Sequence, residues 1–165
     1  MEHKKENEFE KSYKYISKDT TFKNKLKSYF PDLTSCEKLN FSHSEFVEPI
    51  TLNDFPIWLL RKTELLNDIN DFDNLDKTEQ IKVYDSIHLF SKYPIELNKN
   101  QVDKTDCEIR LTFAKKVNNR LPIKYIIIDK NVDPRIDYKP RKGIYIVEFN
   151  EENTIIERGY LILSH

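Results

Sequence analysis

The sequence predicts an α+β fold in which N-terminal helices pack on a C-terminal antiparallel sheet of three to five strands. Apolar residues in the first half of the chain recur at spacings of three and four, which is typical of amphipathic helices. Between residues 121 and 163 they form short runs separated by turn residues, which is typical of adjacent strands. We expect a single domain over residues 1–165, in which residues 1–17 could form a loosely attached helical arm.

Two helices are predicted before residue 31. The first covers residues 6–17, and either Asp19 or Thr20 can cap a second helix that stops before Pro31. Each has one apolar face, so both are expected to pack on the sheet. The residues expected on those faces are Phe9, Tyr13, Ile16, Phe22, Leu26 and Tyr29.

Two more helices are predicted after an irregular stretch at residues 31–53. Asp54 is a good N-cap for the first of them, which carries the apolar residues of the stretch 57–69. Asp76 and Glu79 are spaced like a capping box for the last helix, and Pro94 is expected to end it.

Residues 107–117 fit either a strand or a helix. Alternate residues from Cys107 to Phe113 are apolar, as in a strand, whereas every fourth residue from Ile109 to Leu121 is apolar, as in a helix. We favour the strand, because charged residues fill the positions between the apolar ones.

Three further strands are predicted at residues 124–129, 143–150 and 154–163. Asn118 and Asn119 form a turn before the first of them, a long loop covers 130–142, and residues 151–153 close the last hairpin. Both faces of 154–163 are largely apolar. We therefore expect this strand to be central in the sheet and covered on part of both faces.

Composition favours a small cytoplasmic protein. Hydrophobic residues make up 38% of the chain and charged residues 33%, and a chain of this length can bury a sizeable core. The first 30 residues hold charges throughout, and no apolar run is long enough to span a membrane. Cys36 and Cys107 belong to no CxxC motif and are expected to be inert core residues.

The sequence gives no sign of a cofactor or a metal. Gly143 and Gly159 are the only glycines, which argues against the glycine-rich phosphate loops of Rossmann and P-loop enzymes. The four histidines show no metal-ligand spacing. The acidic stretch 68–79 is spaced in part like an EF-hand loop, but Phe72 and Asp73 stand where an oxygen ligand and a glycine are needed. No catalytic residue is assigned.

Two charged segments are candidate binding surfaces. Residues 31–90 carry five Lys or Arg against twelve Asp or Glu, a net charge of −7, which could face a basic protein partner. The candidate partner-binding residues there are Asp68, Asp71, Asp73 and Asp76. The densest basic patch could bind a phosphate or another anion and stack a base. Its residues are Arg135, Tyr138, Lys139, Arg141 and Lys142. The alternative for both segments is an ordinary solvated surface.

These observations favour a small cytosolic, bacterial protein-binding module. Within that class we expect an immunity or inhibitor protein that neutralises a toxin or an enzyme. The alternatives are a small nuclease or RNase-type toxin that uses the basic patch, and a nucleic-acid-binding regulator. A protein partner is therefore expected, nucleic acid is not favoured, and no membrane is involved.

Overall fold

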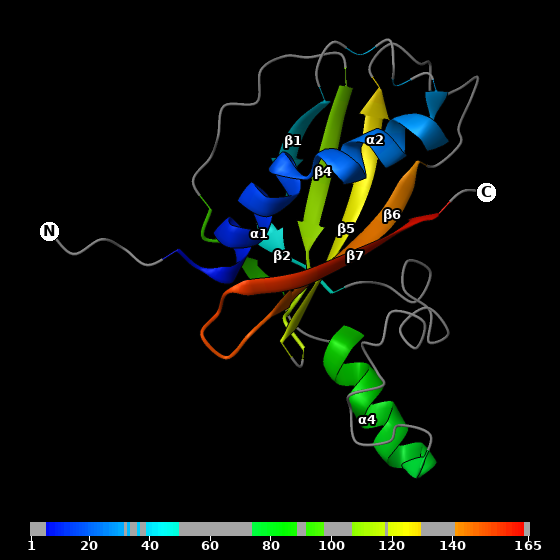
Figure 1. The fold of residues 1–165 in the computed structure, drawn as a ribbon. Helices are drawn as coiled ribbons and strands as arrows, with labels where there is room; N and C mark the ends of the chain where they lie inside the picture. The colour runs from blue at the N-terminus through cyan, green and yellow to red at the C-terminus, as the bar shows by residue number, and fades with distance from the viewer. Residues whose placement is uncertain are drawn as a thin grey trace, which may run out of the picture.

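The computed structural model describes residues 6–31, 33, 36, 39–49, 74–88, 92–97, 107–117, 119–129 and 141–163, and it confirms the α+β fold (Figure 1). Within these residues there are three helices: α1 (Glu8–Lys18), α2 (Thr20–Tyr29) and α4 (Lys77–His88). The strands are β1 (Leu39–His43), β2 (Phe46–Val47), β3 (Tyr93–Pro94), β4 (Cys107–Phe113), β5 (Arg120–Asp129), β6 (Lys142–Phe149) and β7 (Ile155–Leu163). The helix expected after Asp54 lies outside the described residues.

The main sheet has five strands in the order β1-β4-β5-β6-β7. Strands β4 to β7 form an antiparallel meander, and β1 lies parallel to β4 with Leu39 opposite Cys107. Residues 107–113 are therefore a strand, as favoured. A second, two-stranded antiparallel sheet pairs β2 with β3.

The expectation that residues 31–53 are irregular was wrong, because this stretch contains β1 and β2. Only one or two residues of each strand are fully buried, so the local pattern is weak. Pro94, expected to end the last helix, lies instead in β3, and α4 ends at His88. Both β1 and β2 depend on pairing with distant parts of the chain, which periodicity cannot reveal.

The two N-terminal helices lie across one face of the main sheet (Figure 1). Asn7 caps α1 by accepting the backbone N–H of Glu10, and Asp19 caps α2 by accepting that of Phe22. Of the residues expected on the packed faces, Phe9, Tyr13, Ile16, Phe22 and Leu26 are buried as expected, but Tyr29 is 48% exposed, so its expected place on the packed face was wrong. The hydrophobic core comprises Phe9, Tyr13, Ile16, Phe22, Leu26, Leu33, Cys36, Phe41, Val47, Cys107, Ile109, Leu111, Phe113, Leu121, Ile123, Tyr125, Ile127, Tyr145, Val147 and Phe149.

The central strand of the five is β5, and the expectation that residues 154–163 form a central strand was wrong. β7 is the last strand of the sheet, and none of its residues is fully buried. In β6, by contrast, the residues from Gly143 to Val147 are all buried. Both strands are apolar on both faces, so composition alone does not tell which of them lies at the edge.

Gly143 lets a core tyrosine reach across β6. The Tyr125 hydroxyl donates a hydrogen bond to the carbonyl oxygen of Leu161 on β7 at 2.9 Å. A Cβ at residue 143 would lie 2.1 Å from that hydroxyl oxygen and 2.2 Å from the carbonyl oxygen. Only glycine leaves room for this contact.

Cys36 and Cys107 are joined by a disulfide, with their Cα atoms 6.0 Å apart. Both residues are buried, as expected, but the expectation of two inert, separate thiols was wrong. The bond links the segment after α2 to the first residue of β4, across a sequence separation of 71. It therefore ties the helical layer to the sheet.

Candidate functional site

An open pocket lies where α1 meets α2, next to the start of β7. It has a volume of about 650 Å³. Residues from both helices form one wall, and the first residues after the β6–β7 turn form the other. The lining residues of this corner pocket are Glu6, Lys11, Lys14, Tyr15, Lys18, Asp19, Thr20, Thr154 and Ile155.

The three lysines of the corner pocket reach it because of helical spacing. Positions 11, 14 and 18 are three and four residues apart, so they share one face of α1, on the side opposite its buried residues. Lys14 forms an ion pair with Glu6, and Lys11 Nζ donates a hydrogen bond to the carbonyl oxygen of Asn153 at 2.5 Å. The spacing is visible in the sequence, but the apolar stripe dominated the interpretation of this helix.

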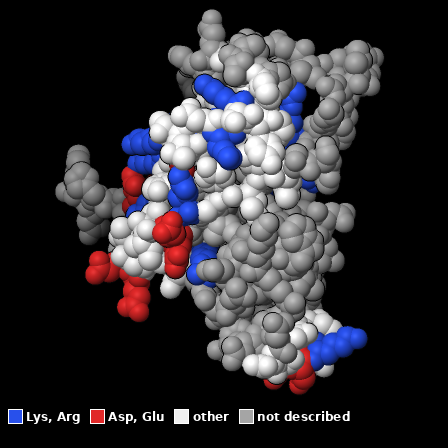
Figure 2. All heavy atoms as spheres, turned by 45° about the vertical axis from the view of Figure 1, so that its right-hand side comes forward, with Lys and Arg blue, Asp and Glu red and all other residues white. Residues whose placement is uncertain are grey.

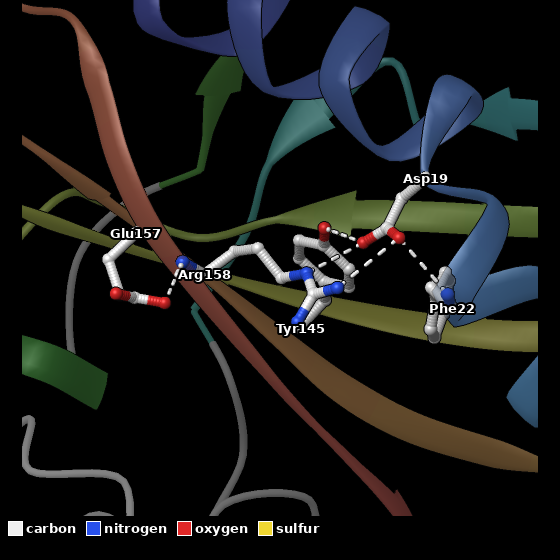
Figure 3. Close-up of polar contacts among 5 residues, drawn as sticks. All are labelled: Asp19, Phe22, Tyr145, Glu157 and Arg158. Carbon is white, nitrogen blue, oxygen red and sulfur yellow. Dashed lines mark hydrogen bonds and ion pairs between the residues drawn. The ribbon is translucent and has the colours of Figure 1, made fainter.

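Asp19 is one of the residues that line the corner pocket, and its polar contacts join the helices to the sheet (Figure 3). Its carboxylate accepts hydrogen bonds from the Tyr145 hydroxyl at 2.7 Å, from Arg158 Nε at 2.8 Å and from the Phe22 backbone N–H at 3.0 Å. The Asp19 side chain is only 7% exposed. One carboxylate thus caps α2 and holds side chains of β6 and β7.

These contacts keep the Asp19 network in one ionisation state. Burial acts to raise the pKa of Asp19, but the hydrogen bonds from Tyr145, Phe22 and Arg158 outweigh it and hold this pKa below its ordinary value. Burial, and then the hydrogen bond to Asp19, raise the pKa of Tyr145. Burial acts to lower the pKa of Arg158, but the hydrogen bond to Asp19 and the charge of Asp19 outweigh this effect, so the pKa of Arg158 lies above its ordinary value. Near neutral pH the network is a fixed ion pair, suited to structure rather than to proton transfer.

Aromatic rings surround this network. The Phe22 ring lies about 5 Å from each of three tyrosine rings, at 5.1 Å from Tyr125 and 5.0 Å from both Tyr145 and Tyr160. The guanidinium of Arg158 lies over the Tyr160 ring at 5.2 Å. The two side chains that bind Asp19, Tyr145 and Arg158, are thus held in place by aromatic contacts.

Three of the nine sequence-predicted site residues lie within the described part of the chain: Asp76, Arg141 and Lys142. Asp76 accepts the Glu79 backbone N–H at 2.8 Å and caps α4, while Asp68, Asp71 and Asp73 lie outside the described residues. Arg141 lies over the Phe30 ring at 5.8 Å, and Lys142 begins β6. Arg135, Tyr138 and Lys139 also lie outside the described residues.

The part of the chain that the structure describes holds no group of three or more His, Cys, Asp or Glu side chains able to bind a metal. Nor does any helix there have the length and apolarity needed to cross a membrane. His43 packs edge-on against Tyr13, with ring centroids 5.5 Å apart.

A second candidate surface is the outer edge of β7. Among the described strands, β7 has a neighbour on one side only. Ile156 on this strand is 56% exposed. In Figure 2, Asp and Glu atoms gather towards the lower left of the described surface, and Lys and Arg atoms predominate above them.

Comparisons of the chain with family models, with curated proteins and with solved structures find no match. The function is therefore argued from the geometry of this molecule alone.

Proposed function

We propose that this protein is a small protein-binding module that receives an extended segment of its partner along the outer edge of β7. The observation that carries the proposal is the edge itself. β7 is nine residues long and closes the sheet order, so an added strand would continue the sheet.

The backbone of β7 shows which groups face a new strand. The Leu161 carbonyl oxygen points towards β6, since it accepts the Tyr125 hydroxyl across Gly143. Backbone groups of successive residues point to opposite sides of a strand. The N–H and C=O groups of Tyr160 and Ile162 therefore point outward, where an added strand would bond to them.

Within the described residues, this edge has little of the usual protection against strand pairing. Edge strands are commonly blocked by proline, lysine or a short length, and β7 has neither residue type in its nine positions. One guard is present: the Glu157 carboxylate accepts the outward N–H of Arg158 at 3.3 Å (Figure 3). That contact is long, so a partner strand can displace it.

Charge along the edge favours one kind of partner. Glu151 and Glu152 are exposed in the turn before β7, whereas Lys142 is opposite Leu163 at its far end. An antiparallel partner segment would start near Leu163 and finish near the turn. The fitting segment is extended, apolar at alternate positions, acidic at its start and basic at its end.

An immunity or inhibitor role remains our favoured form of this function, because a small module that captures an exposed segment can block a toxin or an enzyme. The cytoplasmic location expected from the sequence stays a proposal, and the Cys36–Cys107 disulfide counts against it, because disulfides are rare in reducing compartments. Alkylation of free thiols in intact cells decides the location: two reactive thiols support the cytoplasm, and two blocked thiols support an oxidising compartment.

Synthetic nine-residue peptides test the β7 edge without altering the protein. The probe alternates apolar residues with threonine and has glutamate first and lysine last; its control has the two charges exchanged. Two further versions carry N-methyl groups on the odd or the even amides. Fluorescence polarisation should show binding of the probe, weaker binding of the charge-exchanged control, and loss of binding for only one N-methyl series. Equal effects of both series would rule out strand addition.

Glu157→Gln supplies a complementary test on the protein. If the Glu157 carboxylate guards the edge, this change should tighten probe binding, because a neutral amide is a weaker acceptor for the Arg158 N–H. Glu152→Gln is the matched control, since it removes the same charge from the neighbouring turn. A tighter complex with the control alone would contradict the guard assignment.

A further inference from the structure

The corner pocket carries more positive charge than its own carboxylates neutralise. Of its two acidic residues, Asp19 is bonded to Arg158 and Glu6 is paired with Lys14. Lys11 bonds only to the neutral carbonyl oxygen of Asn153 in the contacts described here. Among the described residues, Lys18 makes no hydrogen bond or ion pair. Two lysine charges in the pocket therefore have no carboxylate partner among the described residues and are available to bind an anionic ligand.

Neutral groups of the corner pocket complement these charges. Thr20 and Thr154, which both carry a side-chain hydroxyl, are among the lining residues. Tyr15 lines the same pocket and is 39% exposed, so one part of its ring is open to a ligand.

We propose that the corner pocket binds a small phosphate ester, with Lys11 and Lys18 contacting the phosphate and Tyr15 flanking the organic part. Two ammonium groups match the charge of a phosphate monoester dianion better than that of a single carboxylate. The pocket volume of about 650 Å³ also suits a ligand of nucleotide size. This site shares only Ile155 with the strand proposed as the partner-binding edge.

In the proposed site, lysine side chains contact the phosphate, whereas in other phosphate sites the backbone of a glycine-rich loop does so. No glycine lines the corner pocket, so its backbone cannot approach a phosphate as closely as a glycine loop does. Long, flexible lysines can reach the anion instead. Binding should therefore be strongly salt-dependent and tolerant of the ester group, apart from a preference for a ring that can stack on Tyr15.

Calorimetry with the full chain tests the site. The probes are inorganic phosphate, ribose 5-phosphate, AMP and a short oligothymidylate, each at low ionic strength. We expect AMP to bind more tightly than ribose 5-phosphate, and ribose 5-phosphate more tightly than phosphate. Lys11→Ala/Lys18→Ala should weaken AMP binding by about a hundredfold, since each charge-assisted bond contributes roughly tenfold.

The control is Lys25→Ala/Lys27→Ala, which removes the same charge from α2 outside the pocket. Equal weakening by both double variants would show general attraction and overturn the proposal, as would no binding of AMP to the wild type. An oligonucleotide that binds far more tightly than AMP and depends on Lys25 and Lys27 would overturn it in favour of an extended nucleic-acid surface.

Two further measurements separate loss of the site from loss of the fold and from failure of the β7 proposal. Lys11→Ala could loosen the turn at Asn153, so Lys18→Glu is tested as well; it should abolish AMP binding at an unchanged melting temperature. AMP binding that survives Lys18→Glu would overturn the proposal. AMP should also leave binding of the β7 peptide probe unchanged. The proposal for the corner pocket and the proposal for the β7 edge can therefore be refuted independently.

Discussion

Replacing Asp19 should reveal how strongly its network holds the helices to the sheet. Asp19→Asn keeps a good N-cap for α2 but removes the charge that pairs with Arg158. Breaking a buried ion pair costs about 3–5 kcal/mol. The Arg158 side chain is 27% exposed, so water can take over part of its solvation. We therefore expect Asp19→Asn to lower the free energy of unfolding by about 2–3 kcal/mol.

Asp19→Ala removes the cap as well as the charge. An N-cap contributes about 1 kcal/mol, so this variant should lose about 3–4 kcal/mol in total. Urea denaturation of wild type, Asp19→Asn and Asp19→Ala at pH 7 measures both steps, and Glu157→Gln on the exposed side of β7 is the control with little expected effect. An Asp19→Asn protein as stable as the wild type would refute the assigned role of the ion pair.

The same network should make the free energy of unfolding depend on pH in the acidic range. Because the pKa of Asp19 lies below its ordinary value of 3.8, the folded state favours the charged carboxylate. Its contribution is fully present above about pH 4 and is lost as the pH falls through the folded-state pKa. The difference between wild type and Asp19→Asn should therefore shrink below pH 4. A difference that stays constant down to pH 2 would contradict this linkage.

Three other perturbations probe the fold. Cys36→Ser/Cys107→Ser should lower the free energy of unfolding by about 4 kcal/mol, because the disulfide closes a long loop. A double variant with the same melting temperature as the wild type, both in the presence and in the absence of dithiothreitol, would contradict this. Phe22→Ala should cost about 3–5 kcal/mol, since the ring is fully buried among three tyrosines, whereas a loss below 1 kcal/mol in urea denaturation would show that the cluster refills. EDTA should leave the melting temperature unchanged, and a drop of several degrees would reveal a bound metal.

The sequence predicts the local part of this fold well. Both N-terminal helices follow from apolar spacing and a capping residue, and Asp19 is one of the two caps considered. The alternation in β4 and the turn at Asn119, whose φ is 64°, depend only on neighbouring residues. Such features need no knowledge of distant pairing.

Long-range pairing accounts for most of what the sequence does not reveal. β1 forms as a strand because it pairs in parallel with the distant strand β4. The same pairing brings Cys36, which precedes β1, close to Cys107 at the start of β4. β7 has apolar residues on both faces, but its position at the edge is set by the sheet order.

The candidate site was equally hidden. Asp19 meets Tyr145 and Arg158 across sequence separations of 126 and 139, so only the capping role of Asp19 is visible locally. The lysine spacing on α1 is visible, but its meaning depends on the β6–β7 turn that completes the corner pocket.

Amide hydrogen exchange in the presence of the nine-residue probe peptide tests the central claim most directly, because it reads the β7 edge residue by residue. Strand addition should slow exchange of the outward N–H groups of Tyr160 and Ile162, while the inward N–H of Leu161, already facing β6, should change little. Protection of the outward amides alone is the result that the account predicts. A bound peptide that leaves Tyr160 and Ile162 unprotected would contradict it.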